Sequence, residues 1–302
     1  MTNTPLPQII SVIGTTASGK SSIGLELAKK YNGEIISADS RQVYKNFDLC
    51  SGKITTEEQK QVPHHLINIC NIGETFSVAD FQNKSYNIIQ DIIKRGKTPF
   101  IVGGTGLYVE SVVHGYVLNE GNPNKKLRVE LETRTIEELL NLLPEDSRNY
   151  IKNNPSDSAN KRRIIRLIEK ADNGESLENK REPQYVALQL GITWPKDILH
   201  KRIDERLTLR IQHGMLEEIR EYLNNGGNPD YLYSLGLEYR YIFWYLTGKY
   251  HSFDEFYTEM SRAIKRFAKR QLTWFRRDKS IHWLNMDDDY LGQASMLIEQ
   301  FI

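Results

Sequence analysis

The chain has 302 residues, 39% of them hydrophobic and 26% charged, a balance typical of water-soluble globular proteins that fold as one large domain or as a core with an insertion. Forty lysines and arginines stand against 39 acidic residues, so the net charge of +1 excludes a general electrostatic attraction for acidic partners. Two cysteines exclude a cysteine-rich zinc centre. The lack of a signal peptide or of an apolar run of about 18 residues leads us to expect a cytoplasmic protein without a membrane segment, and we also expect a monomer.

The first element in chain order is a buried strand that leads into a glycine-rich loop. Residues 8–14 read QIISVIG, a β-branched run of the kind that forms a strand buried on both faces. Apolar residues then recur at helical spacing, which predicts a helix over residues 21–31. The loop between them fits G-x-x-x-x-G-K-[ST] at every fixed position. It consists of Gly14, Thr15, Thr16, Ala17, Ser18, Gly19, Lys20 and Ser21.

Phosphate binding is what this strand, loop and helix predict together. Backbone N–H groups and the positive end of the helix dipole both face an anion placed at such a loop. We expect Lys20 to reach terminal phosphate oxygens and the Ser21 hydroxyl to help hold a Mg²⁺ ion that bridges them. The alternative is a tight glycine turn without a ligand, and the agreement between the motif and its setting argues against it.

Strands and helices then alternate along the chain. Residues 34–38 and 99–106 contain further apolar strands, the segment around Leu66 is a third candidate, and residues 77–95 carry an apolar helical stripe. After about residue 116 the sequence turns polar and helical until a strand returns at residues 185–194. A long helix is expected over residues 199–223, and helices are expected over residues 231–283.

This alternation predicts an α/β fold, a P-loop NTPase-like parallel sheet flanked by helices. Residues 1–117 and 185–302 would form the catalytic core together with C-terminal helices that bind nucleic acid. Residues 118–184 would form a mostly helical insertion domain.

Asp39 ends the second predicted strand, at the edge of the sheet where ligands bind in folds of this class. In an ATPase an acidic residue at such a position orders the magnesium shell, but the strand over residues 99–106 ends without an acid, so the ATPase apparatus is incomplete. Two other roles stay open for Asp39. One is a general base that acts on an incoming nucleophile, and the other is a structural role as a helix N-cap or in an Asx turn.

A basic and aromatic stretch near the C-terminus indicates nucleic-acid binding. Phe267, Trp274 and Phe275 are interleaved with cationic residues that can neutralise backbone phosphates while the rings stack on bases. A second basic cluster lies at residues 161–166 in the insertion, and two separate basic surfaces suit a folded RNA. The alternative is a solvated helix face with a packed aromatic stripe. The cations are Arg262, Lys265, Arg266, Lys269, Arg270, Arg276, Arg277 and Lys279.

With these residues together, the chain resembles the bacterial tRNA dimethylallyltransferase (IPP transferase) family over nearly its whole length. The motifs that carry the resemblance are GTTASGKS at 14–21, ISADSRQVYK at 36–45, IVGGTGLY at 101–108, NKRRIIRLIE at 160–169 and AIKRFAKRQLTWFRR at 263–277. The resemblance implies transfer of a dimethylallyl group from dimethylallyl diphosphate to N6 of adenosine 37, next to the anticodon of a tRNA. The loop would then hold the diphosphate leaving group, and the anticodon stem-loop would be the macromolecular partner.

The resemblance also implies roles for individual residues. Thr16 and Arg206 would contact the diphosphate, Asp39 would relieve the attacking amine of its proton, and Thr105 would complete the catalytic set. The implied tRNA contacts are Asp39, Ser40, Arg41, Gln42, Thr105, Arg128, Arg162, Arg163, Ile164, Ile165, Arg166 and Gly236.

Two segments depart from the family pattern. Residues 48–55 read DLCSGKIT, and residues 234–242 read SLGLEYRYI, where Gly236 is kept but the basic residue that usually follows is displaced to Arg240. Three rival functions remain at this point: a small-molecule kinase, a prenyltransferase that acts on free adenine nucleotides, and a non-catalytic RNA-binding module. The kinase leaves the basic stretch unexplained, the second leaves both basic clusters unexplained, and the third needs neither Lys20 nor Asp39.

Overall fold

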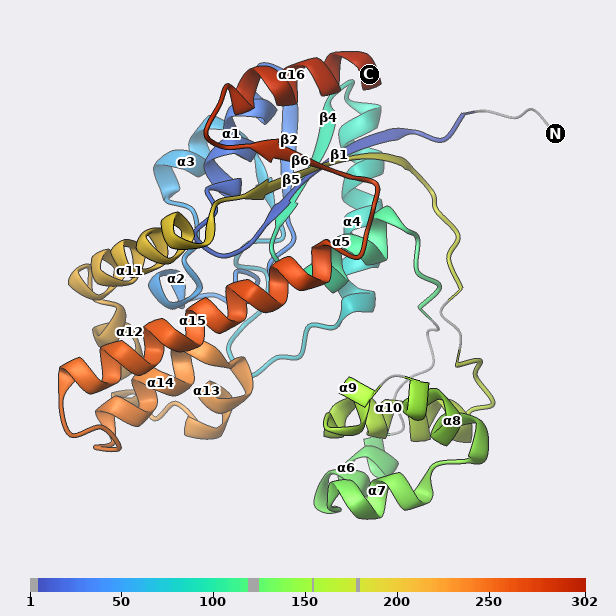
Figure 1. Ribbon diagram of the computed structural model, residues 1–302, viewed down its shortest axis with the longest axis vertical. Coiled ribbons are helices and arrows are strands. Elements are labelled where there is room, and N and C mark those ends of the chain that lie inside the picture. The colour runs from blue at the N-terminus through green and yellow to red at the C-terminus, as the bar shows by residue number, and fades with distance from the viewer. Residues whose placement is uncertain (1–4, 119–124, 154, 178–179) are drawn as a thin grey trace. The chain divides into compact units, whose positions relative to one another are not determined.

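The computed structural model describes residues 5–118, 125–153, 155–177 and 180–302, and the chain divides into two compact units (Figure 1). The first unit comprises Met1–Gly115 and Pro183–Ile302, and the second comprises Tyr116–Glu182. The inserted unit thus starts at 116 and ends at 182, each two residues ahead of the positions expected from the sequence. Among the described residues no helix is both long and apolar enough to cross a membrane.

A parallel sheet of six strands forms the centre of the first unit, which confirms the predicted α/β class. Its strand order is β3-β2-β4-β1-β5-β6, and β1 lies between β4 and β5 with Ile10 opposite both Phe100 and Leu188. The strands are β1 (Gln8–Gly14), β2 (Gly33–Ser37), β3 (His64–His65), β4 (Thr98–Gly103), β5 (Val186–Thr193) and β6 (Ile281–Asn285). The central position of β1 places the loop that follows it in the middle of the sheet edge.

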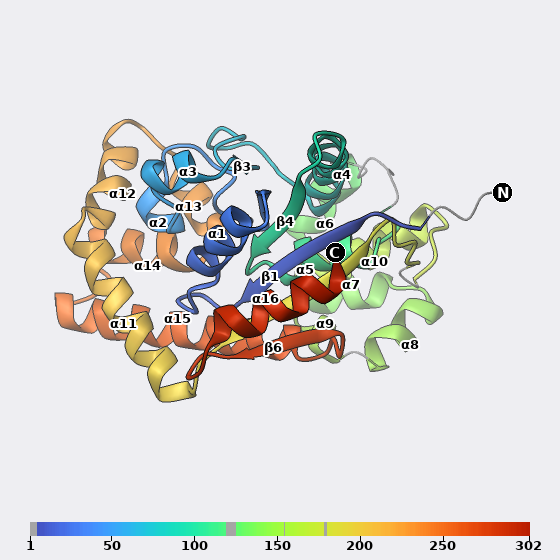
Figure 2. The ribbon, with the colours of Figure 1, turned by 90° about the horizontal axis from the view of Figure 1, so that it is seen from above.

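Helices cover both faces of the sheet (Figures 1 and 2). Because successive strand residues point to opposite faces, Ile10 and Val12 pack into one apolar cluster and Ile9 and Ile13 into another. The first cluster includes residues of α1 (Lys20–Lys30) and α16 (Tyr290–Phe301) and lies beside α3 (Thr56–Gln61), and the second includes residues of α4 (Val78–Lys94) and α5 (Gly106–Val113).

A helical layer packs beyond the sheet with its own apolar core, in which Phe47, Tyr239 and Phe256 are fully buried. It contains α2 (Asp48–Ser51), α11 (Lys196–Gln212), α12 (Met215–Asn224), α13 (Pro229–Leu235), α14 (Leu237–Leu246) and α15 (Phe253–Phe275) (Figure 1). The single helix expected over residues 199–223 is wrong, because Gly214 adopts a left-handed φ of 101° that separates α11 from α12. Strand β6 was also not expected, since its residues fell inside or just beyond the segment assigned to helices.

The inserted unit is helical and has a separate core. Leu131, Leu139 and Ile164 are almost completely buried in it. Its helices are α6 (Lys125–Thr133), α7 (Ile136–Leu142), α8 (Glu145–Asn153), α9 (Pro155–Ser158) and α10 (Lys161–Asp172). Helix α7 begins with a capping box between Thr135 and Glu138, which satisfies two backbone N–H groups of its first turn.

Candidate active site

The phosphate-binding loop connects β1 to the N-terminus of α1, as the motif predicts. Ala17 and Gly19 have left-handed φ angles of 60° and 93°, and such turns bring successive backbone N–H groups to one side of a loop. The neighbouring side chains of Thr15 and Ser18 are fully buried, so the loop is anchored in the protein. The positive end of α1 therefore faces the same space as the amides of the loop.

The carbonyl groups of the loop are held by donors from other elements. Arg202 Nε donates to Ala17 O at 2.9 Å, and Trp194 Nε1 donates to Ser18 O at 2.8 Å. The Arg202 guanidinium also lies over the Trp194 ring, 4.9 Å from its centroid. Because these carbonyl groups are occupied, the loop presents N–H groups rather than C=O groups to a ligand. Sequence reasoning missed Arg202 and Trp194, although Arg202 lies one helical turn before the predicted Arg206.

Lys20 lies at the start of α1, where its Nζ donates to Thr15 O at 3.3 Å. Burial lowers the pKa of Lys20 to about 8, while the nearby Asp39 carboxylate opposes this shift and the Arg206 guanidinium adds to it. A cation with a lowered pKa at the end of a phosphate loop regains its preference for the protonated form when an anion binds. Lys20 is therefore poised to respond to a bound phosphate.

Arg206 reaches the loop from α11 and joins two segments of the site. It donates to Thr16 Oγ1 at 3.2 Å and to Gly52 O at 3.1 Å. Burial, followed by repulsion from Arg210, lowers the pKa of Arg206 to about 10. The structure thus brings together Thr16 and Arg206, which lie 190 positions apart in the sequence.

Asp39 follows β2 and begins a tight turn. Its Oδ1 accepts a hydrogen bond from the Arg41 backbone N–H at 2.8 Å, so the expected Asx turn is present. Asp39 and Lys20 interact electrostatically across the site, and so do Asp39 and Arg206. Since the turn uses one carboxylate oxygen, the other remains available for a substrate, and the two open roles of Asp39 are compatible.

The loop after β4 braces the Asp39 turn. Thr105 Oγ1 accepts from the Ser40 backbone N–H at 3.1 Å, and the Thr105 backbone N–H donates to Ala38 O at 3.1 Å. Gln42, which follows the turn, is buried, and its Oε1 accepts from Ser37 Oγ at 2.9 Å. The predicted residues of both loops therefore form one hydrogen-bonded unit beside the phosphate loop.

Arg41 and Gly236 meet at the junction of α13 and α14. Gly236 has φ 101° and ψ −140°, a conformation that essentially only glycine adopts. A Cβ at this position would lie 3.8 Å from Arg41 Nη2. Gly236, the one residue carried over from the divergent segment, therefore lies near the guanidinium of Arg41.

In the inserted unit the predicted RNA-binding residues differ in their surroundings. Arg162 is exposed, whereas Arg128 makes a two-pronged ion pair with the buried Glu169, at 2.8 and 2.6 Å. Arg163 pairs with Asp157 and Arg166 with Glu175. Ile164 and Ile165 need a correction: both side chains are buried in the core of this unit, so they support α10 and offer no surface to RNA.

Helix α15 carries the C-terminal basic stretch. Its exposed cations are Arg262, Arg266, Lys269 and Arg270, of which Arg262 pairs with Glu259 at 2.8 Å. Arg276, Arg277 and Lys279 follow directly after the helix and are exposed as well. Lys265 differs, since it pairs with Asp204 at 2.6 Å. Phe275 is buried in the core, so the expected role of this ring in base stacking is wrong, whereas Phe267 is exposed next to Arg270.

A Mg²⁺ ion would find few protein ligands here. Within the described ranges there is no group of three or more His, Cys, Asp or Glu side chains that could hold a metal. The half-buried Ser21 hydroxyl stands in the first turn of α1. Because Mg²⁺ usually keeps several waters and binds through substrate phosphates, one hydroxyl beside a phosphate loop fits the ion once a diphosphate is bound.

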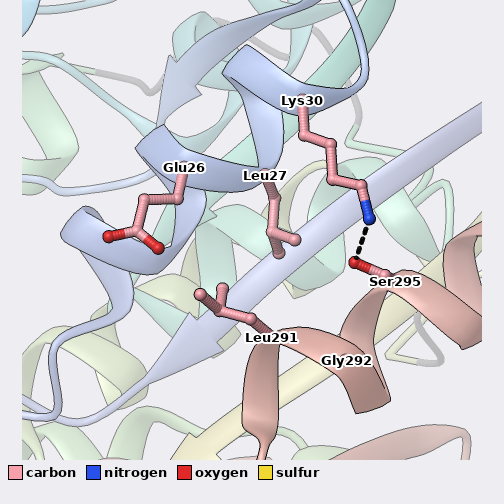
Figure 3. Close-up of a pocket in the computed structure, with 6 residues that line it drawn as sticks. All are labelled: Glu26, Leu27, Lys30, Leu291, Gly292 and Ser295. Carbon is pink, nitrogen blue, oxygen red and sulfur yellow. Dashed lines mark hydrogen bonds between the residues drawn. The ribbon is translucent and has the colours of Figure 1, made fainter.

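Figure 3 shows a depression away from this site, between α1 and α16. Its volume is about 340 Å³, and Lys30 Nζ donates to Ser295 Oγ across it at 2.8 Å. Its lining on α1 runs from Glu26 to Lys30, about 9 to 15 Å along the helix from Lys20. The depression is therefore separate from the phosphate-binding loop.

The fold and the loop define an α/β protein of the P-loop class, in which Arg202 and Arg206 of α11 donate hydrogen bonds to the loop after β1. The model of the family described as IPP transferase matches residues 42–278. The chain belongs to this family.

The names of individual relatives agree with this family membership. The chain is 42% identical to tRNA dimethylallyltransferase 2 of Shewanella sediminis over 95% of this chain and 96% of the relative. The crystal structure of the full-length tRNA isopentenylpyrophosphate transferase from Bacillus halodurans is similar with a TM-score of 0.71 and 33% identity, covering 97% of each chain. A eukaryotic dimethylallyltransferase described as acting on tRNA is similar with a TM-score of 0.77 and 25% identity, over 97% of this chain and 79% of that one.

Proposed function

We propose that the protein transfers a dimethylallyl group from dimethylallyl diphosphate to N6 of adenosine 37 in tRNA and releases diphosphate. Family membership and the names of the relatives support this assignment. The observation that carries it is the joint placement of Lys20, Arg206 and Asp39 around one phosphate loop. The two cations can stabilise a departing diphosphate, and the second carboxylate oxygen of Asp39 can accept a proton from an amine that attacks carbon.

The cationic side of the site stabilises the leaving group. As the bond between the allylic carbon and oxygen breaks, negative charge grows on the diphosphate, and groups already oriented towards that charge lower the barrier. Lys20, Arg206 and the N–H groups of the loop supply such groups. Ser21 would hold a Mg²⁺ ion, which supplies further neutralisation of the diphosphate when bound.

Asp39 acts on the nucleophile. The N6 amine of adenine forms the new C–N bond, and its surplus proton passes to the free oxygen of the Asp39 carboxylate, while the diphosphate leaves with the electron pair of the broken C–O bond. The bond between Asp39 Oδ1 and the Arg41 N–H fixes the orientation of the carboxylate. Thr105 keeps the turn in place through its contact with Ser40.

The basic surfaces bind the RNA. A base must leave its stack to reach a site between two loops, so backbone contacts have to hold the rest of the anticodon arm. The exposed cations of α15 supply such contacts in the first unit, and Arg162 does so in the inserted unit. Under this proposal the first unit carries out catalysis and the second adds further RNA contacts.

The test is a transfer assay with labelled dimethylallyl diphosphate. Purified protein should attach the label to a tRNA that contains adenosine 37 and not to AMP, and nucleoside mass spectrometry should find the modified adenosine. Thermal-shift measurements compare dimethylallyl diphosphate with ATP, since a ligand that binds the folded state raises the melting temperature. Rapid ATP hydrolysis without use of dimethylallyl diphosphate would refute the proposal in favour of a kinase-type activity.

A further inference from the structure

Gln271 of α15 joins the phosphate loop to the loop that follows β4. Its Oε1 accepts a hydrogen bond from the Thr16 backbone N–H at 2.8 Å, and its Nε2 donates to Gly104 O at 2.9 Å. One amide therefore uses both its acceptor and a donor to connect two loops that lie at neighbouring strand ends. Sequence reasoning assigned no role to Gln271.

The loop that follows β4 is shaped to receive α15. A Cβ on Gly104 would lie 2.6 Å from Gln271 Nε2, and a Cβ on Gly106 would collide with the indole of Trp274. Gln271 and Trp274 are three positions apart, so they project from the same side of the helix. Thr105, which braces the Asp39 turn, lies between these two glycines.

The same helix carries the exposed cations on its other side. Ala268 and Phe275 are buried on the stripe that contains Gln271, whereas Arg266, Lys269 and Arg270 are exposed. A displacement of α15 by a ligand on its outer face would therefore move the Gln271 amide and both loops. A small shift at one face of a helix reaches its other face because the helix moves as a rigid body and its packed contacts do not deform gradually.

We propose that Gln271 is a positioning residue that couples RNA docking on the outer face of α15 to the shape of the diphosphate cradle. The inference rests on the proposed function, because it takes the RNA and the diphosphate as the two ligands. Binding of RNA fixes α15, and Gln271 then fixes the Thr16 amide and the Gly104 carbonyl in the arrangement that receives the diphosphate. The coupling is reciprocal, so diphosphate must tighten RNA binding by the same factor.

The experiment measures the dissociation constant of inorganic pyrophosphate by calorimetry, with and without an anticodon stem-loop RNA. In the wild type we expect the RNA to tighten pyrophosphate binding by about tenfold, a usual size for coupling between two sites. The decisive quantity is the ratio of the pyrophosphate dissociation constants measured without and with RNA. Gln271→Met keeps the length of the side chain and removes both hydrogen bonds, and should bring this ratio to within about twofold of one. Thr273→Ala is the matched control on the same helix, since Thr273 Oγ1 donates only to Lys269 O, and should keep the wild-type ratio.

A purely structural role for Gln271 would weaken pyrophosphate binding equally with and without RNA, and that result would overturn the proposal. A wild-type ratio of one would overturn it as well. If Gln271→Met does not fold, Gln271→Asn replaces it, because this side chain keeps the amide but is too short to contact both loops. The ratio of pyrophosphate dissociation constants without and with RNA is then measured for Gln271→Asn. If the wild type prenylates tRNA and Gln271→Met keeps the wild-type ratio, only this inference is refuted. If the wild type couples the two ligands but does not prenylate tRNA, only the proposed function is refuted.

Discussion

Replacing Asp39 by Asn separates the chemical role of this residue from its structural one. The Asn side chain keeps an oxygen that can accept from the Arg41 N–H, a bond of 2.8 Å in the structure, so the turn should persist. What is lost is the negative charge and the ability to take a proton. Asp39→Ala removes the turn bond as well, which adds about 1 kcal/mol of destabilisation.

The expected magnitude follows from the role of the free carboxylate oxygen. Loss of a positioned general base lowers the rate by about 10² to 10⁴, equivalent to about 2.7 to 5.5 kcal/mol in the barrier. Because Asp39 raises the pKa of Lys20 against the effect of burial, its removal leaves Lys20 less protonated, and the measurement should be made near pH 7, below the lysine's pKa of about 8. There the change in diphosphate binding stays small compared with the change in rate.

The assay is single-turnover transfer with saturating dimethylallyl diphosphate, together with filter binding of tRNA. We expect Asp39→Asn to lose at least about a hundredfold in rate with tRNA affinity within about threefold of the wild type. Asp91→Asn is the matched control, since Asp91 is an exposed residue of α4 paired with Arg95, and should have no effect. A rate within tenfold of the wild type, or a tRNA affinity that falls in step with the rate, would refute the general-base role.

The remaining predictions concern the cations and the inserted unit. Arg206→Ala should raise the KM for dimethylallyl diphosphate at least about tenfold, measured by steady-state kinetics, because a buried charge-assisted contact is lost; an unchanged KM would exclude this contact. Since Lys20 has a pKa of about 8 and phosphate favours its protonated form, diphosphate affinity should fall between pH 7 and 9.5, with uptake of about half a proton per site at pH 8 in calorimetry; a flat profile would contradict the assignment. Ile165→Ala should destabilise the inserted unit by about 2 to 4 kcal/mol in thermal unfolding while diphosphate binding persists. Arg162→Ala should leave the fold intact, weaken tRNA binding and reduce its salt slope by about one, and an unaltered slope would place Arg162 outside the RNA contact.

The sequence was informative where function depends on local geometry. The phosphate loop needs a strand before it and a helix after it, and the periodicities of residues 8–14 and 21–31 predict both. Asp39 could be selected because it ends a strand at the ligand-binding edge. The parallel sheet followed from the alternation of strands and helices, and the structure confirms it.

What the sequence could not provide are contacts between distant segments and the direction of individual side chains. Gln271 and Thr16 lie 255 positions apart, and no local pattern links them. Ile164 and Ile165 were grouped with their basic neighbours, although the helix turns about 100° per residue and places them inside. The break at Gly214 was missed because the apolar pattern runs through it, although glycine in a left-handed conformation commonly ends a helix.

The donors that hold the carbonyl groups of the phosphate loop have a consequence for synthesis of the protein on the ribosome. Arg202 and Trp194 follow the inserted unit in the sequence, and so does β5, which pairs along the full length of β1. A nascent chain therefore carries its glycine-rich turn for most of translation before the partners that shape it emerge. Ligand binding by that turn should begin late in synthesis, once about two-thirds of the polypeptide has left the ribosome.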